Sequence, residues 1–133
     1  MVIYFGKQWC LDDVPPLSIN SRNIERVVTF KLLGVVISSD LTWDVHVSYI
    51  LSKCAKHIYC IWNLAKAEVP ACDVVYTYCS VVRSVLEYAC AVWHPGLPNK
   101  LSKNTECVQK RCLKIIYPKL SYSEALEESG LVR

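Results

Sequence analysis

The chain has 133 residues, the length of one ordinary domain, of which 53% are hydrophobic and 20% charged. That is enough length and apolar character to bury a core. Charged residues interrupt the most apolar stretch, residues 74–93, so we predict no membrane-spanning helix. The start of the chain shows no secretory leader, and we therefore expect an intracellular protein, cytoplasmic or nuclear rather than secreted. A net charge of +3 does not by itself indicate a nucleic-acid surface.

The β-rich part of the chain is predicted to be residues 1–38. Val2 to Phe5 forms a short apolar run, and a turn is expected from Asp12 to Pro16. Asn20 to Asn23 separates two further apolar runs and predicts a hairpin turn. Phe30 to Ile37 is an apolar, β-branched run in which a glycine indicates a bulge or a close approach of another backbone.

After residue 40 the hydrophobic period changes from that of a strand to that of a helix. A first helix is predicted from Thr42 to Lys66, with Thr42 or Asp40 as its N-cap. Its apolar residues recur at steps of three and four, at Val47, Ile50, Leu51, Cys54, Ile58, Ile61, Trp62 and Ala65. A second helix is predicted over residues 71–93, apolar almost all round, with an ion pair between Arg83 and Glu87.

A third helix is predicted over residues 99–117, after a proline-rich break. Residues 97–119 contain six basic residues and one acidic residue. Three lysines share the predicted outer face of this helix and an arginine flanks them: Lys103, Lys110, Lys114 and Arg111. Ser121 and Glu124 have the spacing of a capping box for a short last helix that stops at Gly130. The predicted fold class is α+β, with a small β-hairpin unit over residues 1–38 and a mainly helical bundle over residues 39–133.

Large aromatic side chains usually dominate the packing of a core. We therefore expect Trp43, Trp62 and Trp93 to be buried.

The eight cysteines do not have the spacing of a zinc ribbon or a redox motif, and we expect free thiols, mostly on apolar helix faces. Cys54, His57 and Cys60 offer only three ligands where structural zinc takes four, so no metal or other cofactor is expected. Cys90 and His94, with Glu87 nearby, form the best arrangement for nucleophilic catalysis. Cys90 belongs to the most apolar helix, and we expect no such catalysis.

A series of short blocks along the chain resembles the end of the reverse transcriptase of non-LTR (LINE-type) retrotransposons, after its catalytic centre. In chain order these blocks are Val2 to Gly6, Phe30 to Gly34, Leu41 to Trp43, Leu86 to Ala89, Val92 to His94 and Val108 to Arg111. The resemblance covers about residues 1–131. It implies that Phe30 to Gly34 is the primer grip, which holds the primer terminus, and that the helices are the thumb beside the template–primer duplex.

The departure from this family lies in the catalytic residues. An aspartate pair on a hairpin, with a third aspartate upstream, holds the two metal ions of the polymerase. That set is missing from the chain, which resembles a fragment, and we expect no enzymatic activity. The implied partners are a template–primer duplex and the missing palm and fingers.

Residues 18–64 are also similar to an N-terminal segment attributed to the alkylated DNA repair protein of the AlkB homologue 8 type. That family's oxygenase chemistry needs two histidines and a carboxylate on iron. His46, His57 and His94 do not supply this set, so a dioxygenase or methyltransferase function would follow from the domain name only.

The sequence therefore predicts non-catalytic binding of a nucleic-acid duplex. The expected contact residues are Phe30, Lys31, Leu33, Gly34, Lys103, Lys110, Arg111 and Lys114. Two alternatives stay open: a helical protein–protein interaction module, and a gene fragment with no selected function.

Overall fold

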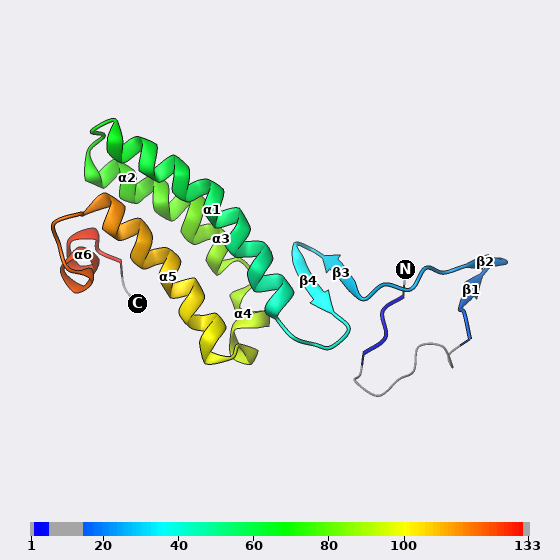
Figure 1. Ribbon diagram of the computed structural model, residues 1–133. Helices are drawn as coiled ribbons and strands as arrows, with labels where there is room; N and C mark the ends of the chain where they lie inside the picture. Colours follow the sequence, from blue (N-terminus) through cyan, green and yellow to red (C-terminus); the bar gives the residue numbers. More distant parts are fainter. Residues whose placement is uncertain (1, 6–14, 132–133) are drawn as a thin grey trace. The chain divides into compact units, whose positions relative to one another are not determined.

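The computed structural model describes residues 2–5 and 15–131, and in them two small antiparallel β-hairpins precede a set of helices (Figure 1). The α+β prediction is therefore confirmed. The chain divides into two compact units, residues 1–46 and residues 47–133, which are described separately below. The turn expected from Asp12 to Pro16 falls largely outside the described residues. In the described part of the chain, no helix combines the length and the apolar character needed to cross a bilayer.

The first hairpin pairs β1 (Ser18–Ile19) with β2 (Arg22–Asn23). Asn20 and Ser21 form its turn, with positive φ values of 49° and 62°. Two-residue turns of this kind match the right-handed twist of paired strands. The sequence thus located the hairpin correctly, but the predicted four-residue turn was too long, since the turn needs only two residues.

The N-terminal segment contacts the chain after the first hairpin through the backbone of Val2 and through the Tyr4 ring, whose centre lies 5.4 Å from the Arg26 guanidinium carbon. The Val2 amide donates to the Glu25 carbonyl at 2.9 Å, and the Val2 carbonyl accepts from the Val27 amide at 3.0 Å. We expected β structure from Val2 to Phe5, but only an isolated bridge at Val2 forms there.

The second hairpin pairs β3 (Thr29–Leu32) with β4 (Val35–Ser38). Leu33 and Gly34 connect the strands with φ values of 46° and 84°, again a tight two-residue turn. The sequence predicted one β run with a bulge or close approach at its glycine, and this was wrong. The left-handed conformation that glycine adopts easily reverses the chain here instead.

Helix α1 (Asp44–Lys66) begins later than predicted. The Asp40 carboxylate accepts hydrogen bonds from the Thr42 amide at 3.0 Å and the Thr42 hydroxyl at 2.9 Å, and these bonds lower the pKa of Asp40. Leu41, between them, has a φ of 57°, which a right-handed helix does not allow. Asp40 and Thr42 therefore stabilise a turn ahead of the helix, and the prediction of either as N-cap was wrong.

The apolar stripe of α1 is confirmed at its centre, where five residues are buried: Val47, Ile50, Cys54, Ile58 and Ile61. Leu51 is half-buried, whereas Trp62 is 45% exposed. Each helical residue is turned about 100° from the one before it, so Trp62 points away from the core that Ile61 enters. Among the tryptophans expected in the core, Trp93 is buried, Trp43 is half-buried and the prediction for Trp62 was wrong.

The second predicted helix is not continuous. It divides into α2 (Ala71–Tyr78), the π-helical turn η2 (Cys79–Arg83) and α3 (Ser84–Glu87), and then α4 (Cys90–Trp93) and the 3₁₀ turn η3 (His94–Gly96). Ala89 interrupts the helix because its φ of 52° is left-handed. The Trp93 indole N–H donates to the Tyr88 carbonyl at 2.9 Å and holds this break. The predicted pair of Arg83 and Glu87 is present, at 2.6 Å.

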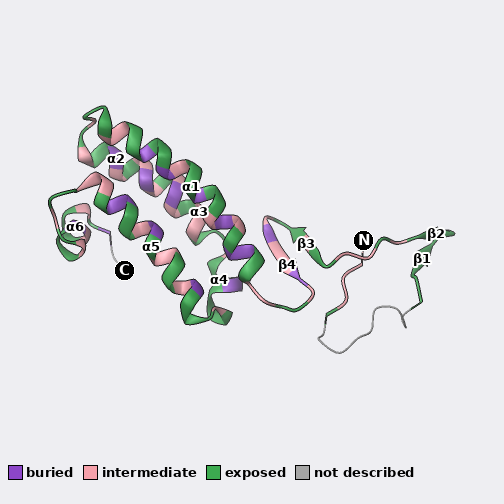
Figure 2. Ribbon diagram, in the orientation of Figure 1, coloured by how far each residue is buried: buried purple, intermediate pink, exposed green. Residues whose placement is uncertain are grey.

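The last two helices match the sequence closely. Helix α5 (Asn99–Ile116) ends one residue before its predicted limit, and α6 (Tyr122–Ser129) carries the predicted capping box and stops at Gly130, whose φ is 66°. The core of the helical unit, residues 47–133, lies between α1, α2, η2, α5 and α6 (Figure 2). Its buried members are Cys54, Ile58, Ile61, Val74, Tyr78, Val82, Val108, Cys112, Leu113, Ala125 and Leu131.

Candidate nucleic-acid interface

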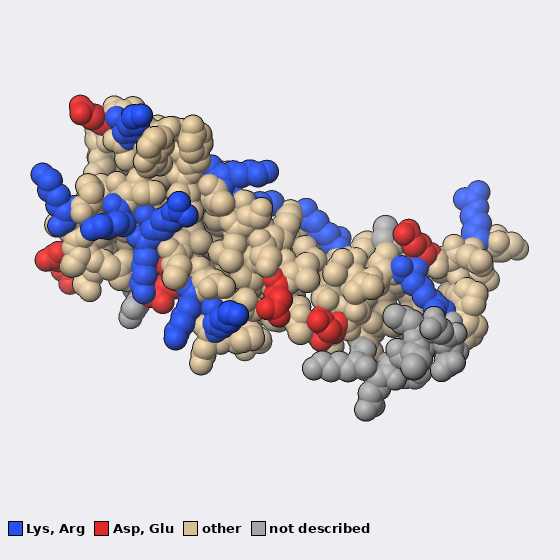
Figure 3. Space-filling model, in the orientation of Figure 1, with Lys and Arg blue, Asp and Glu red and all other residues tan. Residues whose placement is uncertain are grey.

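Helix α5 separates its apolar and basic residues onto different faces. Leu101, Val108, Cys112 and Leu113 are buried. The four predicted contact residues of this helix, Lys103, Lys110, Arg111 and Lys114, are all exposed. Figure 3 shows basic side chains gathered along α5. We call these four residues the α5 basic face.

The three lysines of this face lie nearly one above another. Steps of seven residues and of four residues both return a helix to almost the same side. At 1.5 Å per residue, Lys103 and Lys114 are separated by roughly 16 Å along the axis. A row of cations of this length can meet several phosphates of one nucleic-acid strand.

Some of these lysines already have weak contacts. Lys110 lies 3.5 Å from the Glu106 carboxylate and 5.1 Å from the centre of the Tyr122 ring. The Lys114 ammonium donates to the Pro118 carbonyl at 2.9 Å. Exposed contacts of this kind contribute at most about 1 kcal/mol, so phosphates can compete for both ammonium groups.

The predicted primer-grip residues lie together on the second hairpin. Lys31 is exposed on β3 and Phe30 is half-buried beside it. Leu33 is 83% exposed at the hairpin tip, in the left-handed conformation that branched or bulky residues rarely adopt. An exposed leucine in such a conformation gains little from packing, and residues of this kind cluster at ligand contacts. The structure thus places the predicted residues in two groups, one in each unit.

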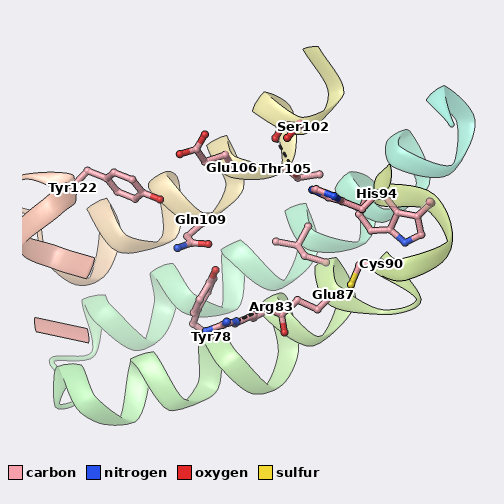
Figure 4. A pocket seen from close by; sticks show the side chains of 12 residues that line it. Tyr78, Arg83, Glu87, Cys90, His94, Ser102, Thr105, Glu106, Gln109 and Tyr122 are labelled. Carbon is pink, nitrogen blue, oxygen red and sulfur yellow. Dashed lines mark hydrogen bonds and ion pairs between the residues drawn. The ribbon is translucent and has the colours of Figure 1, made fainter. Parts of the chain in front are cut away.

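A pocket of about 650 Å³ opens between the η2 region and α5 (Figure 4). Tyr78 and Gln109 reach into it, and the ion pair of Arg83 and Glu87 borders it. The Tyr78 hydroxyl is buried and has no hydrogen-bond partner in the described part of the chain, and burial raises its pKa above the ordinary value. These groups are too mixed in charge to indicate one class of ligand.

The same pocket contains the arrangement that the sequence singled out for nucleophilic chemistry. Cys90 and His94 both line it and both are exposed. A reactive thiol needs a base within hydrogen-bond reach. Across the described residues no hydrogen bond joins these two side chains.

The cysteines differ from the prediction in their location. The seven in the described residues carry free thiols, but only Cys54 and Cys112 are buried, and burial raises their pKa values to about 11 and about 12. Four others are exposed: Cys60, Cys72, Cys90 and Cys107. The prediction of mostly apolar positions was wrong because the buried stripe of each helix is narrower than its apolar sequence. Within residues 2–5 and 15–131, no cluster of histidine, cysteine and acidic side chains is placed to hold a metal ion.

The sequence predicted Trp62 to be buried, but Trp62 instead forms an aromatic pair with Tyr59 on the surface of α1. Tyr59 is 66% exposed, and its ring stacks with that of Trp62 at a centroid distance of 6.1 Å. The sequence feature that indicates this pair is the spacing of the two aromatic residues, which are three positions apart and lie between Lys56 and Lys66.

Comparison with known proteins gives no assignment, since no family model, no curated protein and no solved structure matches the chain.

Proposed function

We propose that the chain binds a nucleic-acid duplex without catalysis, as the primer-grip and thumb portion of a reverse transcriptase of the LINE type. The observation that carries the proposal is the α5 basic face, which stays exposed while the opposite side of the same helix is buried. Three aligned ammonium groups favour contact with backbone phosphates, which carry no sequence information, and so favour binding to duplexes of any sequence.

The hairpin unit supports the proposal in a second way. Among the described residues up to His46, only Val35, Ser38 and His46 are buried. Large apolar side chains are exposed there instead: Ile19 (64%), Val28 (64%), Leu32 (50%), Leu33 (83%) and Leu41 (64%). A unit with so little core and so much exposed apolar surface is typical of one that another domain covers. The palm and fingers of the polymerase would be that covering surface.

The test is a comparison of two triple variants on one duplex. The first variant carries Lys103→Gln, Lys110→Gln and Lys114→Gln, and the second carries Lys53→Gln, Lys56→Gln and Lys66→Gln on α1. Both remove the same charge from exposed positions of the same unit. Fluorescence anisotropy with a labelled RNA–DNA duplex, at several salt concentrations, reports affinity and its salt dependence.

We expect the first variant to bind more weakly and to lose about 3 units of the slope of log affinity against log salt, one for each lost phosphate contact. The second variant should keep the wild-type slope on the duplex. If the two variants bind the duplex equally well, the α5 basic face has no role in binding, and the protein–protein alternative gains support.

A further inference from the structure

The stacked pair on α1 is an unusual use of two large aromatic side chains. Tyr59 and Trp62 are 66% and 45% exposed, although each would stabilise the fold if it were buried. Their rings lie 23° from parallel, so they present flat surfaces in nearly the same direction. We call these two residues the α1 platform. With two-thirds of its surface exposed, the Tyr59 side chain leaves room for another planar ring to join the stack.

The charged side chains of α1 beside the platform are all basic. The Lys66 ammonium lies 5.1 Å from the centre of the Trp62 ring, and Lys56 stands one helical turn before Tyr59. Lys53 adds a third cation to the helix, 4.8 Å from the ring of Tyr49. No acidic residue occurs between residues 45 and 66. The surface is therefore complementary to an anion that also carries flat rings.

We propose that the α1 platform binds single-stranded nucleic acid, with unpaired bases stacking on Tyr59 and Trp62 and phosphates contacting Lys56 and Lys66. Aromatic stacking accepts any base, because every base has a π-face, and lysines beside the rings follow the backbone. Bases inside a duplex are already stacked and paired, so they cannot reach the rings. The platform thus adds a second kind of ligand to the chain, and it uses no residue of the α5 basic face.

The neighbouring side chains favour this occupant over a protein. Several other exposed residues on this side of α1 are small or polar, among them Ser48, Ser52, Ala55 and Asn63. Protein interfaces usually surround their aromatic anchors with a larger apolar core. Two aromatic rings set among lysines and polar side chains match the aromatic and basic surfaces that bind single strands.

The experiment measures anisotropy of a labelled single-stranded oligodeoxythymidylate with four proteins. These are wild type, a Tyr59→Ala, Trp62→Ala double variant, the matching Phe double variant, and Tyr76→Ala. Tyr76 is a suitable control because it is an aromatic side chain that is 76% exposed and belongs to α2 rather than to the platform helix. Circular dichroism establishes that each variant keeps its helices.

The Ala double variant should bind the single strand about 10-fold more weakly, whereas the Phe variant and Tyr76→Ala should stay within about 2-fold of wild type. The same Ala variant should keep its affinity for the RNA–DNA duplex, which separates this proposal from duplex binding by α5. Unchanged single-strand affinity of the Ala variant would overturn the proposal. It would also be overturned if sedimentation showed a wild-type dimer that the Ala variant abolishes while single-strand binding persists.

Discussion

At the scale of single residues, truncation of two neighbouring side chains on α1 should change stability by different amounts. Ile61 is fully buried in the core, and Ile61→Ala should lower the free energy of unfolding by about 2–5 kcal/mol. Trp62→Ala removes a larger side chain but should lower the free energy of unfolding by less than Ile61→Ala does, because that side chain is 45% exposed and does not belong to the core cluster. Urea denaturation of both variants measures the difference. A greater loss for Trp62→Ala would contradict the orientation of this helix.

His46 gives the hairpin unit a pH dependence. It is fully buried, and its Nδ1 accepts a hydrogen bond from the Val36 amide at 3.3 Å, so this nitrogen carries no proton. Burial lowers the pKa of His46 from its ordinary value of 6.5, because the charged form loses water. As pH falls below this ordinary value, the unfolded chain takes up a proton that the folded chain resists. The hairpin unit is therefore most stable above that value and loses stability as pH falls toward the lower folded pKa.

We expect the wild-type melting temperature to fall by a few degrees between about pH 7.5 and about pH 5.5. His46→Gln, which cannot titrate, should show a smaller fall over the same range. Thermal unfolding followed by circular dichroism measures both. An equal fall in the two proteins would show that other groups cause the acid sensitivity.

Residue burial was only partly predictable from the sequence. The periodicity of α1 identified Ile58 and Ile61 as core, because a helix must bury one stripe. It could not set the width of that stripe, which depends on how closely the next helices pack. Trp62 and the exposed cysteines were misplaced for this reason, and the platform formed by Trp62 and Tyr59 went unnoticed with them.

At the scale of elements, the conformation of Leu33 at the tip of the second hairpin should lower the stability of that hairpin. Leu33 adopts a left-handed conformation that costs an ordinary residue about 1–2 kcal/mol and an asparagine less. Leu33→Asn creates the Asn-Gly pair that this turn type prefers, and should raise the stability of the hairpin by about 1 kcal/mol. Hydrogen exchange of the β3 and β4 amides measures the change. Faster exchange in the variant would show that the leucine side chain itself holds the hairpin.

The matched variant Gly34→Ala should have the opposite effect, since alanine at a φ of 84° is strained. If the tip also places a primer end, Leu33→Asn should leave overall duplex affinity almost unchanged.

The extent of the helices was predictable where local signals were strong, as in the capping box of α6. The break at Ala89 was not predictable, because alanine rarely adopts a left-handed conformation. The hydrogen bond from the Trp93 side chain helps to stabilise that conformation.

At the scale of the whole molecule, the chain has one well-packed helical unit and one hairpin unit with little core. The sequence indicated this contrast through its change of hydrophobic period near residue 40. It also identified the α5 basic face, because charge and periodicity are both visible in sequence. It could not show that the Lys110 ammonium lies 5.1 Å from the centre of the Tyr122 ring, since that contact depends on how α6 packs against α5.

The most direct test of duplex binding by α5 is lysine acetylation of the wild-type chain, with and without an RNA–DNA duplex. Mass spectrometry reads the modification of each lysine in one experiment. We expect the duplex to slow acetylation of Lys103, Lys110 and Lys114, while the α1 lysines react at the same rate as in the protein without duplex. Equal protection of every lysine, or protection of the α1 lysines alone, would contradict this expectation.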